Sequence, residues 1–573
     1  MLKLARYLGA YKKECVLGPL FKLLEAIFEL LLPTIMAAMI DNGVNRGDKD
    51  YVLKTGGLMI AMALCGFVSA LVCQYFAARA SQGFGTALRN DLFARISSLS
   101  IAQLDIFGTQ SLTNRITNDV NALQIGVAML IRLVIRAPFI CIGAIVMAML
   151  LNMKMALVLI ASVPVFILII VLIARASAPL YRSYQKKLDF LAVIVRENLS
   201  GVRVIRAFAT TGKEKRRFDS SNDALADTAL SVGRVSALLN PATTLAVNAG
   251  ILAILWMGGK MVGRGEIMQG QVIAFVNYIM QLLLALIVVS NLVVVFSKAS
   301  ASAARVNELL ETETEIGRIE AAYDSPTASA EAPAIEFARV SFGYDGGMAL
   351  RDIELRVERG ESVGIIGGTG SGKSTLLGLV ARFYDATSGE LRIDGAPIRC
   401  ISDAELRAKV GIAPQRALLF SATIAENIAM GAAGRIEATD KDLATAARIA
   451  QAQEFIAKLP AGFQTRVERG GSNFSGGQRQ RLGVARAILG NPEILLLDDA
   501  SSALDYSTDA AMRAALRETR RGLTTVIVSQ RASSIRDADR IVVLDKGSIV
   551  GQGSHEKLMN DCPAYRDIIA SQA

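Results

Sequence analysis

The sequence predicts a membrane domain of six helices followed by a water-soluble α/β domain. Two observations support this fold class. Residues 1 to about 300 contain six apolar stretches, each long enough to cross a hydrocarbon core of about 30 Å. Beyond residue 334, short β-rich runs alternate with helical stretches, which is typical of an α/β domain with a largely parallel sheet. At 573 residues the chain is also too long for a single core.

The composition agrees with a membrane protein that has a soluble portion. Hydrophobic residues make up 52% of the chain and charged residues 20%, and the mean hydropathy is +0.39. The net charge of +10 does not favour nucleic-acid binding, because much of the Lys and Arg flanks apolar stretches, as in cytoplasmic loops of membrane proteins. The six cysteines show no paired or metal-ligand spacing, so neither disulfides nor zinc are expected. The first residues show no pattern of a cleavable signal peptide. Their sequence predicts a short amphipathic helix on the cytoplasmic face.

The six spans are joined by links of alternating length. The outer links, at 41–56, 152–154 and 263–270, are short, whereas 79–125 and 177–242 are long, polar and basic. Their helical periodicity predicts helices that continue far into the cytoplasm. We therefore expect a transmembrane domain at 1–310, a linker rich in Glu, Ala, Ser and Pro at 311–334, and the α/β domain at 335–573. The spans are expected near 15–40, 57–78, 126–151, 155–176, 243–263 and 271–297.

Polar residues inside the spans allow two interpretations. Glu25 and Glu29 share a face of the first span, and Lys22 lies one turn before them. They either contact a cationic substrate or a proton, or form structural pairs with Lys22 or with Arg132 and Arg136, and the structural alternative is favoured. The last two spans carry further polar residues that either line a translocation path or hydrogen-bond between helices, namely Asn248, Asn277, Gln281 and Asn291.

A glycine-rich loop marks a nucleotide site in the α/β domain. It follows the apolar strand 362–366 and leads into a helix that begins at Lys373. In this context backbone N–H groups cradle phosphates, Lys373 reaches the β and γ phosphates of ATP, and Ser374 ligates Mg²⁺. The residues expected to bind nucleotide here are Gly367, Gly368, Thr369, Gly370, Ser371, Gly372, Lys373, Ser374 and Thr375.

Two further apolar strands end in polar residues. The run 494–497 leads to Asp498, which is expected to hold Mg²⁺, usually through water. Asp499 comes directly after it. The next apolar strand, 526–529, leads to Gln530.

With Ser-Gly-Gly-Gln at 475–478 and the following Arg-Gln-Arg-Leu, these motifs resemble an ATP-binding-cassette (ABC) transporter subunit of the exporter type. The resemblance implies an ATPase coupled to transport, with ATP and Mg²⁺ as cofactors, in a bacterial cytoplasmic membrane with the N-terminus and the ATPase domain inside. It also implies short coupling helices at the hairpin tips, near 112–121 and 209–214. The stretch 197–208 is similar to the second hairpin of the family.

The resemblance assigns further roles. Tyr344 matches the aromatic residue that stacks on adenine, Gln415 the glutamine that contacts Mg²⁺ and the coupling helices, and Asp505 the last residue of the D-loop. The signature residues Ser475, Gly476, Gly477 and Gln478 would face the γ-phosphate bound by a second subunit. A single cassette therefore implies an obligatory partner half-transporter.

Two residues depart from the family pattern. Asp499 stands where the family has glutamate, and Gln530 stands where it has histidine; the only histidine, His555, lies past the strand 541–544. Aspartate is one methylene shorter, and glutamine can hydrogen-bond but carries no charge. Neutral drift with useful turnover remains an alternative. The combination resembles the degenerate-site subunit of heterodimeric multidrug-type exporters. The candidate catalytic residues are Lys373, Gln415, Asp499 and Gln530.

The expected function is ATP-driven export of a small amphiphilic, lipid-like or peptide substrate, as one half of a heterodimer. Its signature would complete the partner's active site. The alternatives are an importer with the exporter fold, for example for siderophores, a homodimer with two slow sites, and a nucleotide-gated regulator.

Overall fold

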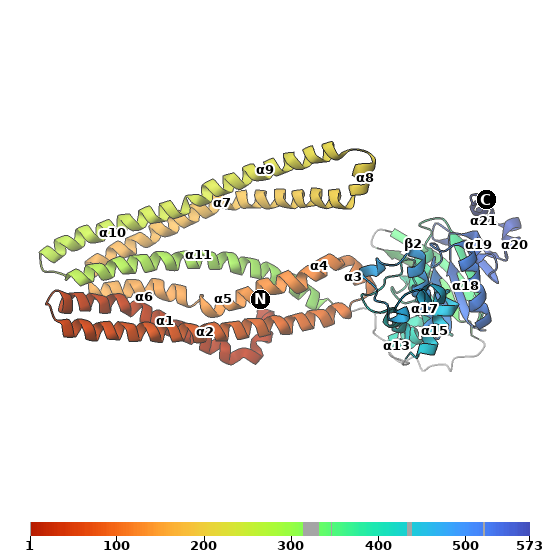
Figure 1. The fold of residues 1–573 in the computed structure, drawn as a ribbon, viewed down its shortest axis with the longest axis horizontal. Coiled ribbons are helices and arrows are strands. Elements are labelled where there is room, and N and C mark those ends of the chain that lie inside the picture. Colours follow the sequence, from red (N-terminus) through yellow and green to blue (C-terminus); the bar gives the residue numbers. More distant parts are fainter. Residues whose placement is uncertain (1, 313–331, 345–346, 433–437, 520–521, 573) are drawn as a thin grey trace. The chain divides into compact units, whose positions relative to one another are not determined.

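The computed structural model describes residues 2–312, 332–344, 347–432, 438–519 and 522–572. It divides into two compact units (Figure 1). The membrane unit comprises Met1–Ser97 and Thr109–Thr312, and the ATPase unit comprises Ser98–Gly108 and Glu313–Ala573. Long apolar helices form the first unit and an α/β domain forms the second, so the predicted fold class is confirmed.

Six helical segments in the described part of the chain are long and apolar enough to span a membrane, as predicted. Several extend far beyond a hydrocarbon core: α7 has 48 residues, or about 72 Å at 1.5 Å per residue. Figure 1 shows α7 and α9 running side by side up to α8. The elements of this unit are η1 (Leu2–Tyr11), α1 (Lys12–Met39), η2 (Ile40–Val44), α2 (Lys49–Ser97), α4 (Thr109–Asn114), η3 (Arg115–Asp119), α5 (Val120–Arg132), α6 (Arg136–Leu151), α7 (Met153–Ser200), α8 (Val202–Ala207), α9 (Thr211–Ala237), α10 (Leu239–Gly263) and α11 (Gln269–Glu311).

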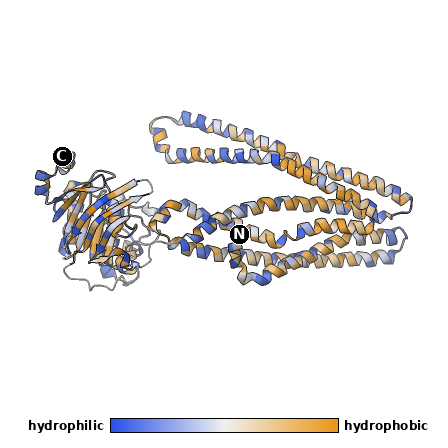
Figure 2. Cartoon of the chain, turned by 180° about the vertical axis from the view of Figure 1, so that it is seen from behind, coloured by the Kyte–Doolittle hydropathy of each residue, from blue (hydrophilic) through white to orange (hydrophobic). Residues whose placement is uncertain are grey.

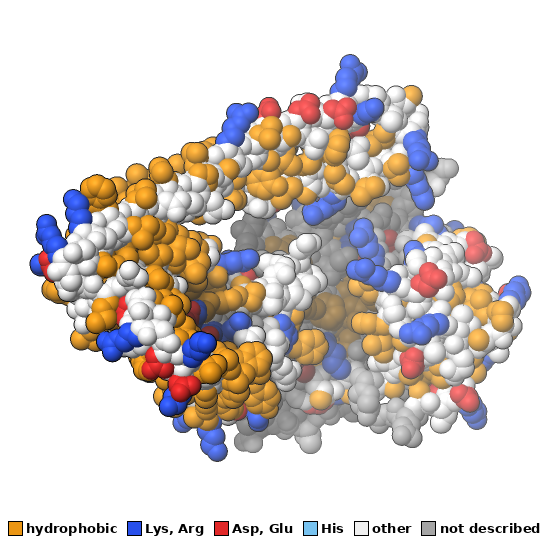
Figure 3. Space-filling model, turned by 60° about the vertical axis from the view of Figure 1, so that its left-hand side comes forward, with side chains coloured by type: hydrophobic (Ala, Val, Ile, Leu, Met, Phe, Trp, Pro, Cys, Tyr) orange, Lys and Arg blue, Asp and Glu red, His pale blue; other side chains and the backbone are white. Residues whose placement is uncertain are grey.

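Large apolar side chains cover the outer faces of these helices (Figure 3). Leu168 and Leu172 on α7 are 58% and 57% exposed, and Trp256 on α10 is 69% exposed. Figure 2 shows the hydrophobic residues along the spans and a polar far end on the hairpin of α7 and α9. Water would not tolerate so large an apolar surface, whereas lipid tails would cover it.

Charged side chains of the first and third spans pair inside the membrane unit. Lys22 Nζ lies 2.6 Å from Glu25 Oε2, and Arg136 Nη2 lies 2.6 Å from Glu29 Oε2. Arg136 Nε also lies 3.9 Å from Glu25 Oε1. Gln281 on α11 donates to the Glu29 carbonyl at 3.2 Å. These contacts agree with the structural alternative, in which Lys22 and Arg136 neutralise the two carboxylates.

The third span is interrupted in its middle. Turn residues 133–135 separate α5, which ends at Arg132, from α6, which begins at Arg136. Pro138 lies two residues into α6. Proline has no N–H, but the first turn of a helix has unpaired N–H groups in any case. The chain therefore accommodates Pro138 by starting a new helix before it.

The tip of the first long hairpin, between α2 and α4, lies before the predicted position. The short helix α3 (Ile101–Phe107) occupies the tip at 98–108, which groups with the ATPase unit, and the prediction of 112–121 was wrong. Ser100 caps α3 in a capping box, and Gly108 ends it with a φ of 71°. The helix-capping residues show where this tip lies. The spacing of apolar residues does not, because it continues through the tip without a break.

The tip of the second hairpin is also earlier than the predicted 209–214. Gly201 ends α7, and α8 follows directly. On and after α8, Val204 is 61% exposed and Phe208 is 75% exposed. The second tip therefore presents apolar side chains on a polar hairpin.

The ATPase unit contains two sheets. In the six-stranded sheet the order is β10-β9-β3-β8-β7-β6, with only β10 antiparallel; the four-stranded antiparallel sheet has the order β2-β1-β4-β5. The central strands are buried on both faces, which explains their continuous apolar runs. The strands are β1 (Ile335–Tyr344), β2 (Gly347–Val357), β3 (Ser362–Gly367), β4 (Ser388–Ile393), β5 (Ala396–Pro397), β6 (Val410–Ala413), β7 (Ile494–Asp498), β8 (Thr524–Val528), β9 (Arg540–Asp545) and β10 (Ser548–Gly553).

Helices cover the sheets and position the loops. The helix after the glycine-rich loop runs from Lys373 to Val380, as predicted. The helices are α12 (Lys373–Val380), η4 (Ile398–Cys400), α13 (Asp403–Lys409), α14 (Ile424–Ala429), η5 (Met430–Ala432), α15 (Asp440–Ile449), α16 (Gln453–Ala457), η6 (Gly462–Gln464), η7 (Arg469–Gly471), α17 (Gly476–Leu489), α18 (Tyr506–Thr519), α19 (Ala532–Ile535), α20 (His555–Asp561) and α21 (Pro563–Ala570).

The linker predicted at 311–334 is described only at its ends. α11 ends at Glu311 and β1 begins at Ile335. Residues 313–331 lie outside the described residues.

Candidate nucleotide site

Four loops of the ATPase unit leave the carboxyl ends of neighbouring parallel strands. Residues 367–374 follow β3, Gln530 follows β8, Asp498 ends β7 and Gln415 follows β6. The carboxyl ends of parallel strands meet at one edge of a sheet, where α/β proteins bind their ligands. The fold therefore gathers the residues that the sequence analysis singled out.

The glycine-rich loop wraps around the side chain of Lys373. Lys373 Nζ donates to the carbonyls of Gly367 at 2.8 Å and Gly368 at 2.7 Å, and the residue is only 8% exposed. Gly372 has a φ of 98°, and a Cβ at this position would lie 2.8 Å from the carbonyl oxygen of Ala349. Only glycine fits there. The loop is thus a cradle lined by backbone, as a phosphate site requires.

Ser374 and Asp498 form the pair expected at a Mg²⁺ site. Ser374 Oγ donates to Asp498 Oδ1 at 2.9 Å. Burial raises the pKa of Asp498; the hydrogen bond from Ser374 opposes this shift and the charge of Asp499 adds to it. Burial also lowers the pKa of Lys373, against the attraction of both aspartates. A bound cation and a bound phosphate would each offset a buried charge, so these residues fit Mg²⁺ and a nucleotide.

Asp499 is buried in the turn after β7. It is 7% exposed, and its φ of 47° lies in the left-handed region, which aspartate tolerates better than most residues. Its amide donates to the Val528 carbonyl at 2.9 Å. Gln415 Nε2 donates to Asp499 Oδ2 at 3.3 Å. The structure therefore brings two of the predicted catalytic residues into contact.

Gln530 has an exposed side chain on a backbone that is held from two sides. Its carbonyl accepts a hydrogen bond of 2.6 Å from Gln572 Nε2. The next residue, Arg531, donates to the carbonyls of Ser502 at 2.8 Å and Leu504 at 2.9 Å. The switch loop, which we define as residues 529–532, is thereby joined to the D-loop at 502–505.

Tyr344 ends β1 with a ring that is 46% exposed. Its hydroxyl lies 3.2 Å from Thr375 Oγ1, in the helix after the glycine-rich loop. Phe342 and Tyr384 meet this ring edge to face, with centroids 4.9 and 5.4 Å away. An aromatic cluster thus holds an exposed ring beside the cradle, where adenine stacking is expected.

The signature residues form the N-terminus of α17. Ser475 Oγ accepts from the Gln478 amide at 3.2 Å, and Gln478 Oε1 accepts from the Ser475 amide at 2.9 Å. A Cβ on Gly477 would lie 2.9 Å from the Ala503 carbonyl oxygen, so this glycine lets the D-loop pack against the helix. Together with Gly476, these residues give an ordered and capped helix N-terminus, which favours anions.

Asp505 closes the D-loop in front of α18. It accepts hydrogen bonds from the Ser507 hydroxyl and from the Thr508 amide, the latter at 3.1 Å. These bonds hold the pKa of Asp505 well below its usual range. The carboxylate therefore stays charged and anchors the first turn of α18.

Comparisons with known proteins agree with this architecture. The family model for the ABC transporter transmembrane region matches residues 15–286, and the family model described as ABC transporter matches residues 350–502. An uncharacterized ABC transporter ATP-binding protein of Mycobacterium tuberculosis is 37% identical over 100% of this chain and 98% of its own length. The chain belongs to the ABC transporter family.

Two further comparisons refine the match within the ABC family. The fatty acid ABC transporter ATP-binding/permease protein of M. tuberculosis is 34% identical over 87% of this chain and 79% of its own length. The structure of a bacterial Atm1-family ABC exporter with ATP bound is 28% identical, with a TM-score of 0.78 and 98% coverage of both chains. The chain is thus a fused ABC exporter half-transporter, an ATPase coupled to transport, and such half-transporters dimerise.

Sequence reasoning did not find every residue that shapes this ABC site. Gln480 donates to Ser502 Oγ and accepts from the Ala503 amide, both at 2.8 Å. Gln480 belongs to the Arg-Gln-Arg-Leu run after the signature, and this run could have indicated its role. No sequence pattern indicates a role for Arg531 or Gln572. His555 Nδ1 lies 2.8 Å from the Tyr565 hydroxyl in the last helices and takes no part in the switch loop.

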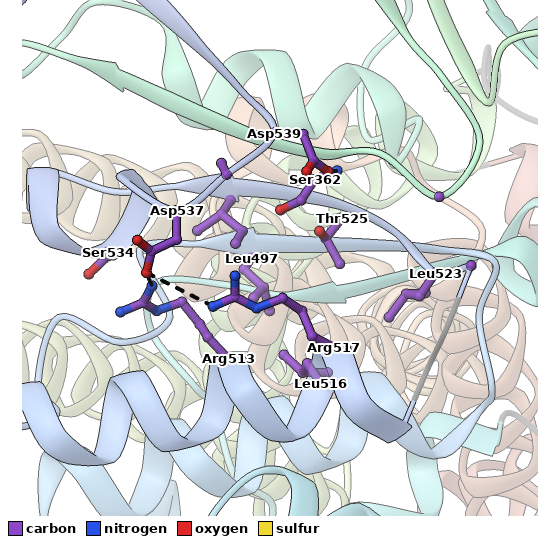
Figure 4. A pocket seen from close by; sticks show the side chains of 14 residues that line it. Ser362, Leu497, Arg513, Leu516, Arg517, Leu523, Thr525, Ser534, Asp537 and Asp539 are labelled. Carbon is purple, nitrogen blue, oxygen red and sulfur yellow. Dashed lines mark hydrogen bonds and ion pairs between the residues drawn. The ribbon is translucent and has the colours of Figure 1, made fainter. Parts of the chain in front are cut away.

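A separate cavity of about 240 Å³ lies between α18 and the six-stranded sheet (Figure 4). Arg513 Nη1 lies 3.3 Å from Asp537 Oδ2, and Arg517 Nη2 lies 3.9 Å from the same oxygen. None of the predicted nucleotide residues lines this cavity. Its charges are paired with one another, so it has no marked preference for an anion or a cation.

Proposed function

We propose that this chain is the hydrolytically weak half of a heterodimeric ABC exporter. Its own site would bind Mg²⁺ and ATP but hydrolyse slowly, while its signature would complete an efficient site on the partner. The observation that carries this proposal is the pair of residues Asp499 and Gln530 in an otherwise complete site.

In this proposal Asp499 acts on the attacking water, but its side chain is too short. Its carboxylate falls about 1.5 Å, one C–C bond, short of the position that glutamate would reach. A misplacement of this size in a general base costs about 100-fold in rate. The hydrogen bond from Gln415 also occupies one of its oxygens, at 3.3 Å.

Gln530 weakens the same chemical step. Its exposed amide can donate to a phosphate oxygen, but it cannot carry a positive charge or titrate near neutral pH as histidine does. Because both substitutions affect the transfer of the same phosphoryl group, we favour an inefficient site over neutral drift that leaves turnover intact.

The signature supports the second half of the proposal. Ser475 and Gln478 form a complete capping box, and the helix that follows is regular. A partner with glutamate and histidine at the matching positions would therefore find an intact signature here. ATP binding would close the two ATPase domains, the long helices would pass this movement to the spans, and hydrolysis at the partner's site would reset them.

The substrate class is an amphiphile, with lipid-like molecules favoured. The support is the similarity to the relative named as a fatty acid transporter. Small molecules and peptides of similar amphiphilic character remain within this class. The proposed location is a bacterial cytoplasmic membrane.

The test is ATP binding and steady-state ATP hydrolysis by the purified chain in detergent or lipid. We expect Mg²⁺-dependent ATP binding with slow turnover, and a rise of about 10- to 100-fold in Asp499→Glu/Gln530→His when a second subunit supplies an intact signature. Lys373→Ala, which loses the phosphate ligand, serves as the inactive control. Brisk hydrolysis by the unaltered chain alone, or no gain in the double variant when a second subunit supplies an intact signature, would contradict the proposal.

The subunit composition is tested separately. The complex is purified from its own host through a tag on this chain, and its mass is measured. We expect two different ABC half-transporters. A complex of two identical copies would favour the homodimer with two slow sites.

A further inference from the structure

The side chain of Gln572, just after α21, contacts the backbone of the switch loop. Its Nε2 donates to the Gln530 carbonyl at 2.6 Å, and its Oε1 accepts from the Ala532 amide at 2.8 Å. We propose that Gln572 is a positioning residue for the switch loop, so that residue 530 meets the nucleotide in one fixed geometry. This inference rests on the proposed role of residue 530.

The chemistry of the contact suits only a carboxamide. The two bonds fall on either side of Arg531, one as a donor and one as an acceptor. An amide is the neutral side chain that offers an N–H donor and a carbonyl acceptor in one plane. A carboxylate would keep the acceptor and lose the donor, and an apolar side chain would lose both.

Contacts of Arg531 hold the opposite side of the loop. Its guanidinium donates to the D-loop carbonyls of Ser502 and Leu504, and its amide donates to Ser529 Oγ at 2.9 Å. With Gln572 on one side and the D-loop on the other, the backbone of the switch loop is fixed at three consecutive residues. The Gln530 side chain has no part in these bonds and stays exposed.

Gln572 is itself anchored to the core of the ATPase unit. Tyr565 on α21 is fully buried, and its hydroxyl lies 2.8 Å from His555 Nδ1. Tyr565 belongs to an apolar cluster that also contains Ile366, next to the glycine-rich loop, and Ile535, next to the switch loop. The glycine-rich loop, the switch loop and the helix that precedes Gln572 are therefore all attached to one tightly packed cluster.

Loss of this contact should affect turnover more than binding. In the phosphate cradle, Lys373 donates to Gly367, Gly368 and Ser371 and not to Gln572, so ATP affinity should not change. Residue 530 would move on a loosened backbone, and displacements near 1 Å can lower a rate by up to about 100-fold. We expect a fall in kcat of about tenfold with KM unchanged within about twofold.

Hydrogen–deuterium exchange of the full chain tests the contact directly. In Gln572→Ala, the peptide containing Ala532 should exchange faster, because its amide loses its acceptor. Gln572→Glu keeps an acceptor and should stay protected. Ser571→Ala is the matched control, since the Ser571 hydroxyl donates only to Ile568 in its own helix, at 2.7 Å. Unchanged exchange in Gln572→Ala overturns the proposal.

Steady-state ATP hydrolysis then tests the positioning role. The three variants are compared in the Asp499→Glu/Gln530→His background, where turnover is easier to measure. The expected order of kcat is Ser571→Ala, then Gln572→Glu, then Gln572→Ala, with a common KM. Equal kcat values, or a rise in KM with a lower melting temperature, would show a merely structural contact and overturn the proposal. Both readouts are ratios between variants, so brisk hydrolysis by the unaltered chain would contradict the proposed function alone.

Discussion

The hydroxyl of Tyr384 donates a 2.9 Å hydrogen bond to the carboxylate of Asp105. Asp105 lies on α3, at the tip of the first long hairpin, which groups with the ATPase unit. The ring of Tyr384 meets Tyr344 edge to face. Burial, with the charge of Asp105, raises the pKa of Tyr384, so its hydroxyl keeps the proton that it donates. The ring proposed to stack on adenine is thus two contacts away from α3.

This arrangement predicts that nucleotide binding changes the mobility of α3. ATP should slow hydrogen–deuterium exchange of the peptide spanning 98–108 in the unaltered chain. Tyr384→Phe should abolish most of that ATP-dependent change while leaving ATP affinity within about twofold, because the ring contact with Tyr344 remains. Asp105→Asn, which keeps an acceptor oxygen, should behave like the unaltered chain. An equal ATP effect in Tyr384→Phe would contradict the prediction.

At neutral pH, Asp498 should lower the stability of the nucleotide-free protein while it allows Mg²⁺ to bind. Burial raises its pKa, so the carboxyl favours the fold while protonated, and this contribution is lost as the pH rises through the folded-state pKa. At neutral pH, Asp498→Asn should therefore raise the melting temperature of the nucleotide-free protein and remove the Mg²⁺-dependent stabilisation by ATP. Below the ordinary range of aspartate pKa values, the two proteins should melt alike. Thermal scans with and without Mg²⁺ and ATP measure both effects, with the exposed Asp545→Asn as control.

Tyr344 should contribute to ATP affinity through its ring. Stacking of a base on an aromatic side chain is worth about 1–3 kcal/mol, so Tyr344→Ala should weaken ATP binding by about tenfold. Tyr344→Phe loses only the contact of 3.2 Å with Thr375 and should bind nearly as well. Isothermal titration with ATP measures the change. Unaltered affinity in Tyr344→Ala would place adenine elsewhere.

Arg136 should be essential to the stability of the membrane unit. It lies within ion-pair distance of both Glu25 and Glu29. Removing one partner of a fully buried ion pair costs about 3–5 kcal/mol, and the cost should be smaller here because Arg136 and Glu29 are 22% and 37% exposed. Arg136→Met should lower the melting temperature in lipid nanodiscs, and adding Glu29→Gln should restore part of it. A double variant no more stable than Arg136→Met would refute this coupling.

The sequence predicted the elements whose physics is local or strongly periodic. The helix after the glycine-rich loop, from Lys373 to Val380, and the strand from Ile335 to Tyr344 have the predicted bounds, because a glycine-rich turn marks the first and apolar residues at alternating positions mark the second. The tip at α3 was misplaced because its capping box depends on Ser100 and Gln103, in a segment that otherwise continues the helical pattern. The contact of Gln572 with the switch loop was not predictable, because it joins residues that only the tertiary fold brings together.

The interruption at 133–135 gives the third span a point at which it can bend. A continuous helix must tilt as one rod, and bending it breaks backbone hydrogen bonds in an apolar solvent. Here the regular ladder is already disturbed at the turn, where the Leu133 and Val134 amides both donate to the Met129 carbonyl. The half that ends at Arg132 and the half that begins at Arg136 therefore need not share an axis. The end of this span next to the long hairpin can follow a movement of that hairpin while the other end keeps its place among its neighbours.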